Sequence, residues 1–195
     1  MAAGVTGKIK GVGNDIVEYM TEVAVHFDLT IVVTSGYRDA AGQAKAMFDN
    51  WIKLKRGVVY SKKALPEEDR KKLDAHYDIV KGTKADAKSR LASEAAFLKL
   101  AAEKVGTKSR HSHGRAVDVT KASVPANAYA AITRRMQEIR EGGRNDIYHF
   151  ESLGIIPKVT DADRKIWDVA KSAAVSPHRT FLMAGGDDLP CVCIG

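Results

Sequence analysis

Two short segments carry histidines and acidic residues whose types and spacing could hold a metal ion. Residues 109–118 read Ser-Arg-His-Ser-His-Gly-Arg-Ala-Val-Asp, and residues 146–149 read Asp-Ile-Tyr-His. Imidazole nitrogen and carboxylate oxygen are ligands of catalytic zinc, which uses three protein ligands and keeps a fourth position for water. His111, Asp118 and His149 could supply such a set.

The local pattern predicts how the first of these segments is built. Residues 109–120 are expected to form a strand, or a hairpin-like bend at Gly114. On an extended strand, residues two apart share a face, so His111 and His113 would point together. The residues alone do not choose between these two histidines as the ligand. They place one or both of them near Asp118.

Apolar periodicity predicts the elements that must position these groups. The pattern favours a small α+β fold, with an antiparallel sheet that carries the metal ligands, helices packed on that sheet, and a helical insertion. The expected helices cover residues 14–27, 39–51, 85–105, 125–140 and 161–174, with another beginning at 65–68, and the expected strands cover 29–33, 109–120 and 146–151.

A single domain is expected over residues 1–195. Within it, residues from about 53 to 108 are rich in lysine, alanine and acidic residues and are interpreted as the helical insertion. Residues from about 158 to 195 are expected to form a C-terminal capping helix and tail. We expect three side chains of that helix to face the core, namely Ile166, Trp167 and Ala170.

The composition is that of a globular domain, with 45% hydrophobic residues and five prolines. No apolar stretch approaches the roughly 20 residues that a membrane-spanning helix requires. Lysine and arginine number 31 and aspartate and glutamate number 24, which gives a net charge of +7. This charge should attract polyanions. Nucleic acid is not the expected partner, because the basic residues are dispersed and no recognised nucleic-acid-binding module is present.

The two ends of the chain give weaker signals. Residues 1–8 contain neither a basic segment followed by an apolar one nor a small-residue cleavage site, so no Sec signal is expected. Cys191 and Cys193 lie two residues apart at the C-terminus, where they cannot form a disulfide framework. We interpret these cysteines as incidental, with metal binding or tail anchoring as the alternative.

Three motifs together resemble those of the zinc D-alanyl-D-alanine peptidase family, which includes the endolysin-like phage L-alanyl-D-glutamate endopeptidases. The first motif matches at five positions, which are Ser109, His111, Gly114, Ala116 and Asp118. Residues 146–149 resemble the family segment in which an acidic residue precedes the last metal histidine by three. Residues 35–38, Ser-Gly-Tyr-Arg, followed by Gln43, resemble an upstream family segment. The resemblance covers residues from about 30 to 151, and three motifs in the family order are far more specific than one.

The resemblance implies a role for each matching residue. It makes His111, Asp118 and His149 the ligands of one Zn²⁺, Asp146 the general base, and Arg38 a group that binds substrate or stabilises developing negative charge. Zinc lowers the pKa of its bound water to about 7 and polarises a carbonyl, while a nearby carboxylate moves the proton to the leaving amine. The resemblance therefore implies that the protein is a metallopeptidase that hydrolyses peptidoglycan and so degrades the bacterial cell wall.

Candidate substrate-binding residues are Ser109, His113 and Gln43. Two of these assignments have a structural alternative: Ser109 could be a turn residue, and His113 could be an exposed side chain. Asp146 could likewise be a turn residue after two glycines, and Arg38 could be a surface ion-pair partner.

Glu151 lies two residues beyond His149 and would share its strand face, so it could orient that ligand. We favour the interpretation of an exposed strand carboxylate at this position.

The acidic residue at position 146 bears on which bond is cut. Many family members have glutamate there, and the aspartate of this chain looks more like the phage endopeptidase branch. We therefore expect an L-alanyl-D-glutamate endopeptidase. The alternatives are a D-alanyl-D-alanine carboxypeptidase or dipeptidase, and a metal-containing module that binds the wall without catalysis.

The expected partners are peptidoglycan stem peptides and the anionic cell envelope, and a monomer is expected. A wall hydrolase made in the cytoplasm without a Sec signal would act on the wall or in the periplasm after release or injection. Such delivery fits an antibacterial protein such as a phage lysin or an interbacterial toxin.

Overall fold

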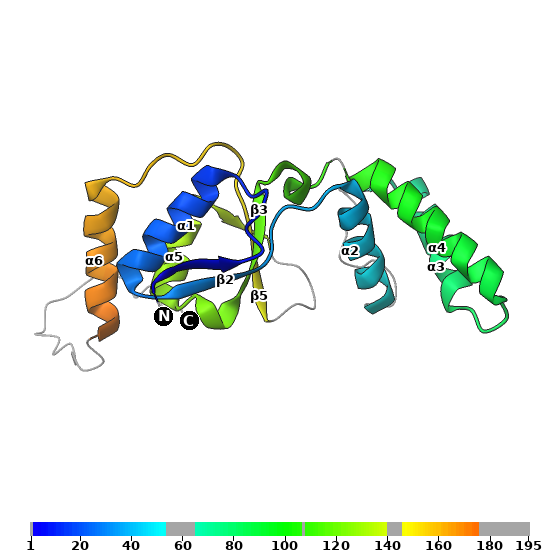
Figure 1. Ribbon diagram of the computed structural model, residues 1–195, viewed down its shortest axis with the longest axis horizontal. Helices are drawn as coiled ribbons and strands as arrows, with labels where there is room; N and C mark the ends of the chain where they lie inside the picture. The colour runs from blue at the N-terminus through cyan, green and yellow to red at the C-terminus, as the bar shows by residue number, and fades with distance from the viewer. Residues whose placement is uncertain (1, 54–64, 107, 140–145, 176–195) are drawn as a thin grey trace, which may run out of the picture.

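The computed structural model describes residues 2–53, 65–106, 108–139 and 146–175. Figure 1 shows a sheet with helices beside it, and a group of helices that extends away from that sheet. The elements in chain order are β1 (Gly4–Gly7), α1 (Asn14–Phe27), β2 (Thr30–Ser35), α2 (Ala40–Lys53), α3 (Glu67–Lys81), α4 (Ala87–Ala101), the π-helical turn η1 (Ala102–Gly106), the 3-10 turn η2 (Arg110–His113), β3 (Ala116–Thr120), the 3-10 turn η3 (Lys121–Ser123), α5 (Ala126–Thr133), β4 (Gln137–Glu138), β5 (Ile147–Glu151) and α6 (Asp161–Val175).

The predicted α+β class is confirmed, and the sheet is mixed rather than wholly antiparallel. Within the described residues its strand order is β1-β2-β3-β5-β4. Strand β1, which the periodicity did not predict, pairs parallel with β2. The strands around the candidate ligands pair antiparallel, with β3 between β2 and β5. The part of the sheet that carries the site therefore has the predicted arrangement.

One hydrophobic core lies between the sheet and helices α1, α5 and α6 (Figure 1). Helix α1 has the predicted bounds, because its apolar residues recur at intervals of three and four and form one buried stripe. Ile16 and Val23 on that stripe are fully buried. The Tyr19 hydroxyl donates to the Ala131 carbonyl oxygen at 2.6 Å, which ties α1 to α5. Burial raises the pKa of Tyr19 to about 12.

A second hydrophobic core lies among α2, α3 and α4, away from the sheet (Figure 1). Trp51, Leu73 and Phe97 are fully buried in it. The indole Nε1 of Trp51 donates to Asp74 Oδ1 at 2.8 Å, so the apolar ring is buried while its polar atom keeps a partner. The predicted insertion is thus helical where the structure describes it, and it packs around α2 rather than on the sheet.

Two sequence predictions about the remaining helices were wrong in part. The helix expected over 125–140 ends at Thr133, because residues 137–138 pair with the edge of β5 instead of continuing the helix. In α6 the Trp167 side chain is buried as expected, but Ile166 is 44% exposed. Among the helices that the structure describes, none has the length and apolarity that a membrane crossing demands.

Gly114 occupies a backbone position that requires glycine. Its φ of 64° lies in the left-handed region, and a Cβ added there would lie 2.4 Å from the Gly11 carbonyl oxygen. Its own carbonyl accepts a hydrogen bond of 2.8 Å from the Gly13 N–H. This residue therefore joins the turn before β3 to the start of α1.

We predict that Gly114→Ala lowers the free energy of unfolding by about 2 kcal/mol or more, because a left-handed alanine and the clash with Gly11 add together. Urea denaturation measures the loss. Gly154→Ala is the control, since a Cβ there would meet nothing within 4 Å. Equal stabilities of the two variants would contradict the explanation.

Arg115 connects the beginning of α1, the start of β3 and the segment after β5. Its Nη1 donates to Asp15 Oδ1 at 2.6 Å, and its Nη2 donates to Ser152 Oγ at 2.7 Å. Asp15 Oδ2 also accepts from the Ile156 N–H at 2.7 Å. Burial raises the pKa of Asp15, but the Arg115 hydrogen bond, the Ile156 N–H and the Arg115 charge outweigh that effect, so the pKa is lowered.

We predict that Asp15→Asn lowers the free energy of unfolding by about 1.5–3 kcal/mol at pH 7, as expected for charge-assisted hydrogen bonds. A lowered folded-state pKa stabilises the fold above the unfolded pKa, and this contribution is lost as the pH falls through the folded value. The difference from wild type should therefore narrow below about pH 4. Denaturation curves at several pH values test this, and a difference that does not depend on pH would contradict it.

Candidate metal centre

His111 lies in the 3-10 turn η2, which corrects the expectation of an extended strand there. The Ser109 hydroxyl caps this turn by accepting from the His111 N–H at 3.3 Å, and Gly114 closes it in the left-handed conformation. His111 is buried, with 3% of its surface exposed, whereas His113 is exposed. The two side chains do not share a face. The structure therefore selects His111 over His113 for the buried group.

The second ring nitrogen of His111 is held by the main chain. Nδ1 lies 2.6 Å from the Gly36 carbonyl oxygen, which can only accept, so Nδ1 carries the proton. In the neutral ring Nε2 then has a lone pair. Among the residues that the structure describes, Nε2 is buried and has no hydrogen-bond partner. A buried acceptor without a partner is costly in free energy, and a metal ion at this position would satisfy it.

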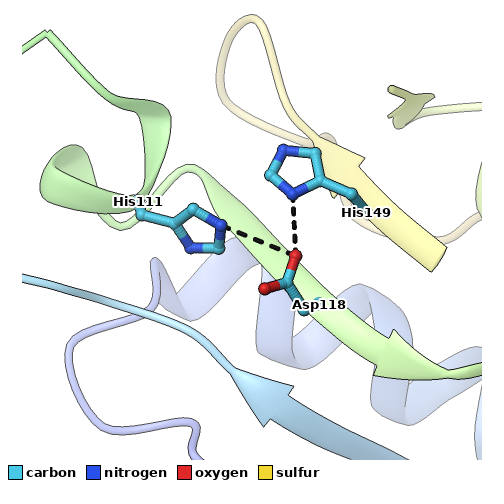
Figure 2. A group of neighbouring side chains, drawn as sticks. All are labelled: His111, Asp118 and His149. Atoms are coloured by element: carbon cyan, nitrogen blue, oxygen red, sulfur yellow. Dashed lines mark hydrogen bonds and ion pairs between the residues drawn. The ribbon is translucent and has the colours of Figure 1, made fainter. Parts of the chain in front are cut away.

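Asp118 and His149 face this nitrogen from two neighbouring strands (Figure 2). They are register partners on β3 and β5, so their side chains leave the same face of the sheet. His149 Nδ1 lies 2.7 Å from Asp118 Oδ1, and His111 Nε2 lies 3.6 Å from the same oxygen. The candidate ligand atoms of the three residues lie within 4.8 Å of one another. The structure thus brings together the three predicted ligands in a buried group that could hold a metal ion.

The electrostatics of this group favour an ionised Asp118. Burial raises the pKa of its carboxyl, but the interactions with the imidazoles of His111 and His149 outweigh burial and hold the pKa well below its usual range. An ionised carboxylate and a deprotonated imidazole nitrogen are the forms that bind metals. Two imidazoles and one carboxylate are a donor set that binds divalent metals, and catalytic zinc sites with one position left open use such a set.

Glu151 belongs to this group, which corrects its interpretation as an exposed strand carboxylate. Its side chain is only 22% exposed, and Oε1 lies 3.0 Å from His149 Nε2. The His149 hydrogen bond lowers the pKa of Glu151, and burial opposes that effect only partly. The alternation of side chains along a strand was the signal that could have identified this contact.

Arg38 contacts a candidate ligand directly. Its Nη2 lies 2.9 Å from Asp118 Oδ2, and its Nη1 donates to Gln43 Oε1 at 3.3 Å. Gln43 is buried, with 5% of its surface exposed. The alternative of a surface ion pair is wrong for Arg38, because its partner carboxylate is 1% exposed. The roles of Arg38 and Gln43 in binding substrate remain predictions.

The other candidate residues are not part of the buried group. Asp146 is exposed and directly precedes β5, and its carbonyl oxygen accepts from the Lys121 N–H at 3.0 Å. Ser109 acts as the cap of η2, which agrees with the alternative of a turn residue. The roles of Asp146 as general base and of Ser109 and His113 in substrate binding remain predictions. Cys191 and Cys193 lie outside the described residues.

Comparison with protein-family models, with curated proteins and with solved structures found no match. The observation that bears on function is therefore the site itself. A buried His-Asp-His group is compatible with a metalloenzyme.

Proposed function

We propose that this protein is a zinc-dependent peptidase that hydrolyses the peptide stems of bacterial peptidoglycan, at the bond between L-alanine and D-glutamate. The observation that carries the proposal is the buried group of His111, Asp118 and His149, in which the buried Nε2 of His111 makes no hydrogen bond with the described residues. The residues of this group are those that the resemblance to zinc D-alanyl-D-alanine peptidases singles out as ligands.

The residues that the resemblance singles out have the chemistry that peptide hydrolysis needs. A bound zinc ion supplies Lewis-acid chemistry, which polarises a peptide carbonyl and makes water a better nucleophile near neutral pH. Asp146 takes a proton from the attacking water and delivers it to the amine that leaves. Arg38 carries five N–H donors, of which some bond Asp118 and Gln43. The others can bind a substrate carboxylate or developing negative charge.

The charge of the chain supports a substrate in the bacterial envelope. The net charge of +7 attracts anionic wall polymers over a distance of about 10 Å at moderate salt. Sedimentation of the protein with purified cell walls should therefore weaken as salt is added. Release from a phage-infected cell, or injection by a competing bacterium, would bring such a protein to its substrate.

The proposal is tested by hydrolysis of purified peptidoglycan. We expect the zinc-loaded protein to release new amino groups and to clear a wall suspension, and we expect a chelator to stop both changes and added zinc to restore them. New N-terminal D-glutamate identifies the proposed endopeptidase. Released D-alanine would reassign the enzyme to D-alanyl-D-alanine cleavage. Wall binding without any new amino groups would favour the non-catalytic module instead.

A further inference from the structure

Two of the three candidate ligands are held from behind by a group that does not face the metal position. The His111 ring is held through Nδ1 by the Gly36 carbonyl oxygen at 2.6 Å. The Asp118 carboxylate is held through Oδ2 by Arg38 at 2.9 Å. These contacts leave His111 Nε2 and Asp118 Oδ1 directed at the candidate metal position. This arrangement raises the question of what holds His149.

Glu151 is in position to hold the third ligand. The two side chains leave the same face of β5, and Glu151 Oε1 lies 3.0 Å from His149 Nε2. The opposite ring nitrogen, Nδ1, lies 2.7 Å from Asp118 Oδ1. The cross-strand partners of Glu151 are Ala116 on β3, whose methyl group has no polar atom, and Gln137 on β4, whose side chain is exposed. The imidazole of His149 is therefore placed between the metal position and Glu151.

We propose that Glu151 is a positioning residue for the metal centre: it accepts the Nε2–H of His149, and so leaves Nδ1, on the side of Asp118, as the nitrogen that would bind the metal. This inference rests on the metal centre of the proposed function. A carboxylate behind a ligating histidine fixes the ring orientation and raises the basicity of the ligating nitrogen. Without that carboxylate, the ring of His149 loses the contact at Nε2 that opposes rotation of the ring.

The test compares zinc affinities of the full-length protein by competition with a chromogenic chelator. Glu151→Ala should weaken zinc binding about 10- to 100-fold, the usual effect of removing such a partner. Glu151→Gln should lose less than about 10-fold, because its amide oxygen still accepts from Nε2–H although the negative charge is gone. If Glu151→Gln binds zinc more tightly than Glu151→Ala, the hydrogen bond to His149 matters. A general effect of the negative charge would weaken zinc binding equally in both variants.

Glu138→Gln is the matched control, since Glu138 also lies at the β4–β5 edge but accepts from the Tyr129 hydroxyl at 2.6 Å. Its zinc affinity should equal that of wild type. Thermal unfolding of each variant shows whether it is folded. In two-bond ¹H–¹⁵N spectra of the zinc-loaded protein, His149 should show a protonated Nε2 and a metal-bound Nδ1, and this signature should be lost in Glu151→Ala.

Wild-type zinc affinity in folded Glu151→Ala, or an unchanged His149 signature, would overturn the inference. So would an equal loss in Glu151→Gln and Glu151→Ala. These outcomes are independent of peptide hydrolysis. If Glu151 controls zinc affinity but no wall peptide is cut, the proposed function fails and the positioning role stands. If wall peptides are cut but the Glu151 variants bind zinc normally, the positioning role fails and the function stands.

Discussion

Asp118→Asn should abolish stoichiometric zinc binding and reduce wall hydrolysis to background. The substitution keeps the size of the side chain and an oxygen that can accept from Arg38, but it removes the negative charge that lies 2.7 Å from His149 Nδ1. A neutral amide oxygen is a poor ligand for zinc in a site of this kind. We expect zinc affinity to fall by more than about 100-fold. This loss exceeds the effect of removing a residue that only hydrogen-bonds a metal ligand. Metal analysis of the dialysed protein measures the loss.

His76→Ala is the control for this experiment, because His76 lies on α3, outside the buried His-Asp-His group. It should retain wild-type zinc content. His111→Ala should behave like Asp118→Asn, since His111 supplies one of the three clustered candidate ligand atoms. If both site variants retained stoichiometric zinc, the metal would be bound elsewhere in the chain.

Asp146→Asn should lower kcat for peptide hydrolysis by about 10²- to 10⁴-fold while zinc remains bound, because removal of a general base has that effect. Asp146 is exposed and is not one of the three clustered ligands, so its substitution should leave zinc affinity unchanged. Single-turnover hydrolysis of a wall peptide, together with metal analysis of the same sample, measures both quantities.

Asp161→Asn is the matched control, since Asp161 is an exposed acidic residue at the start of α6. It should hydrolyse the peptide at the wild-type rate. An Asp146→Asn variant with wild-type kcat would show that another group moves the proton. In that case Glu151, whose carboxylate contacts His149, would be the next residue to test.

The candidate ligands could be predicted from the sequence because short motifs indicate which residue types must converge. The strand around Asp118 and the strand around His149 were expected from alternation, and they are register partners in the sheet. The choice of His111 over His113 followed from the family motif alone. The periodicity pointed to an extended segment, whereas a cap at Ser109 and a left-handed Gly114 turn the backbone into a 3-10 turn.

Other features could not be predicted because they depend on contacts between distant segments. The Gly36 carbonyl that holds His111 lies 75 positions earlier in the chain. The Ser-Gly-Tyr-Arg segment marks this region in the sequence, but the motif does not reveal that its backbone carbonyl contacts a histidine. The packing of α3 and α4 around Trp51 rather than on the sheet is equally a tertiary outcome. The early end of α5 has the same origin, because β5 offers backbone partners to Gln137 and Glu138.

The central claim is tested most directly by mass spectrometry of a defined muropeptide after incubation with the zinc-loaded protein. We predict release of a peptide that begins with D-glutamate and a glycan fragment that ends in L-alanine, with neither product formed by Asp118→Asn. An intact muropeptide after incubation with protein shown to contain stoichiometric zinc would contradict the account.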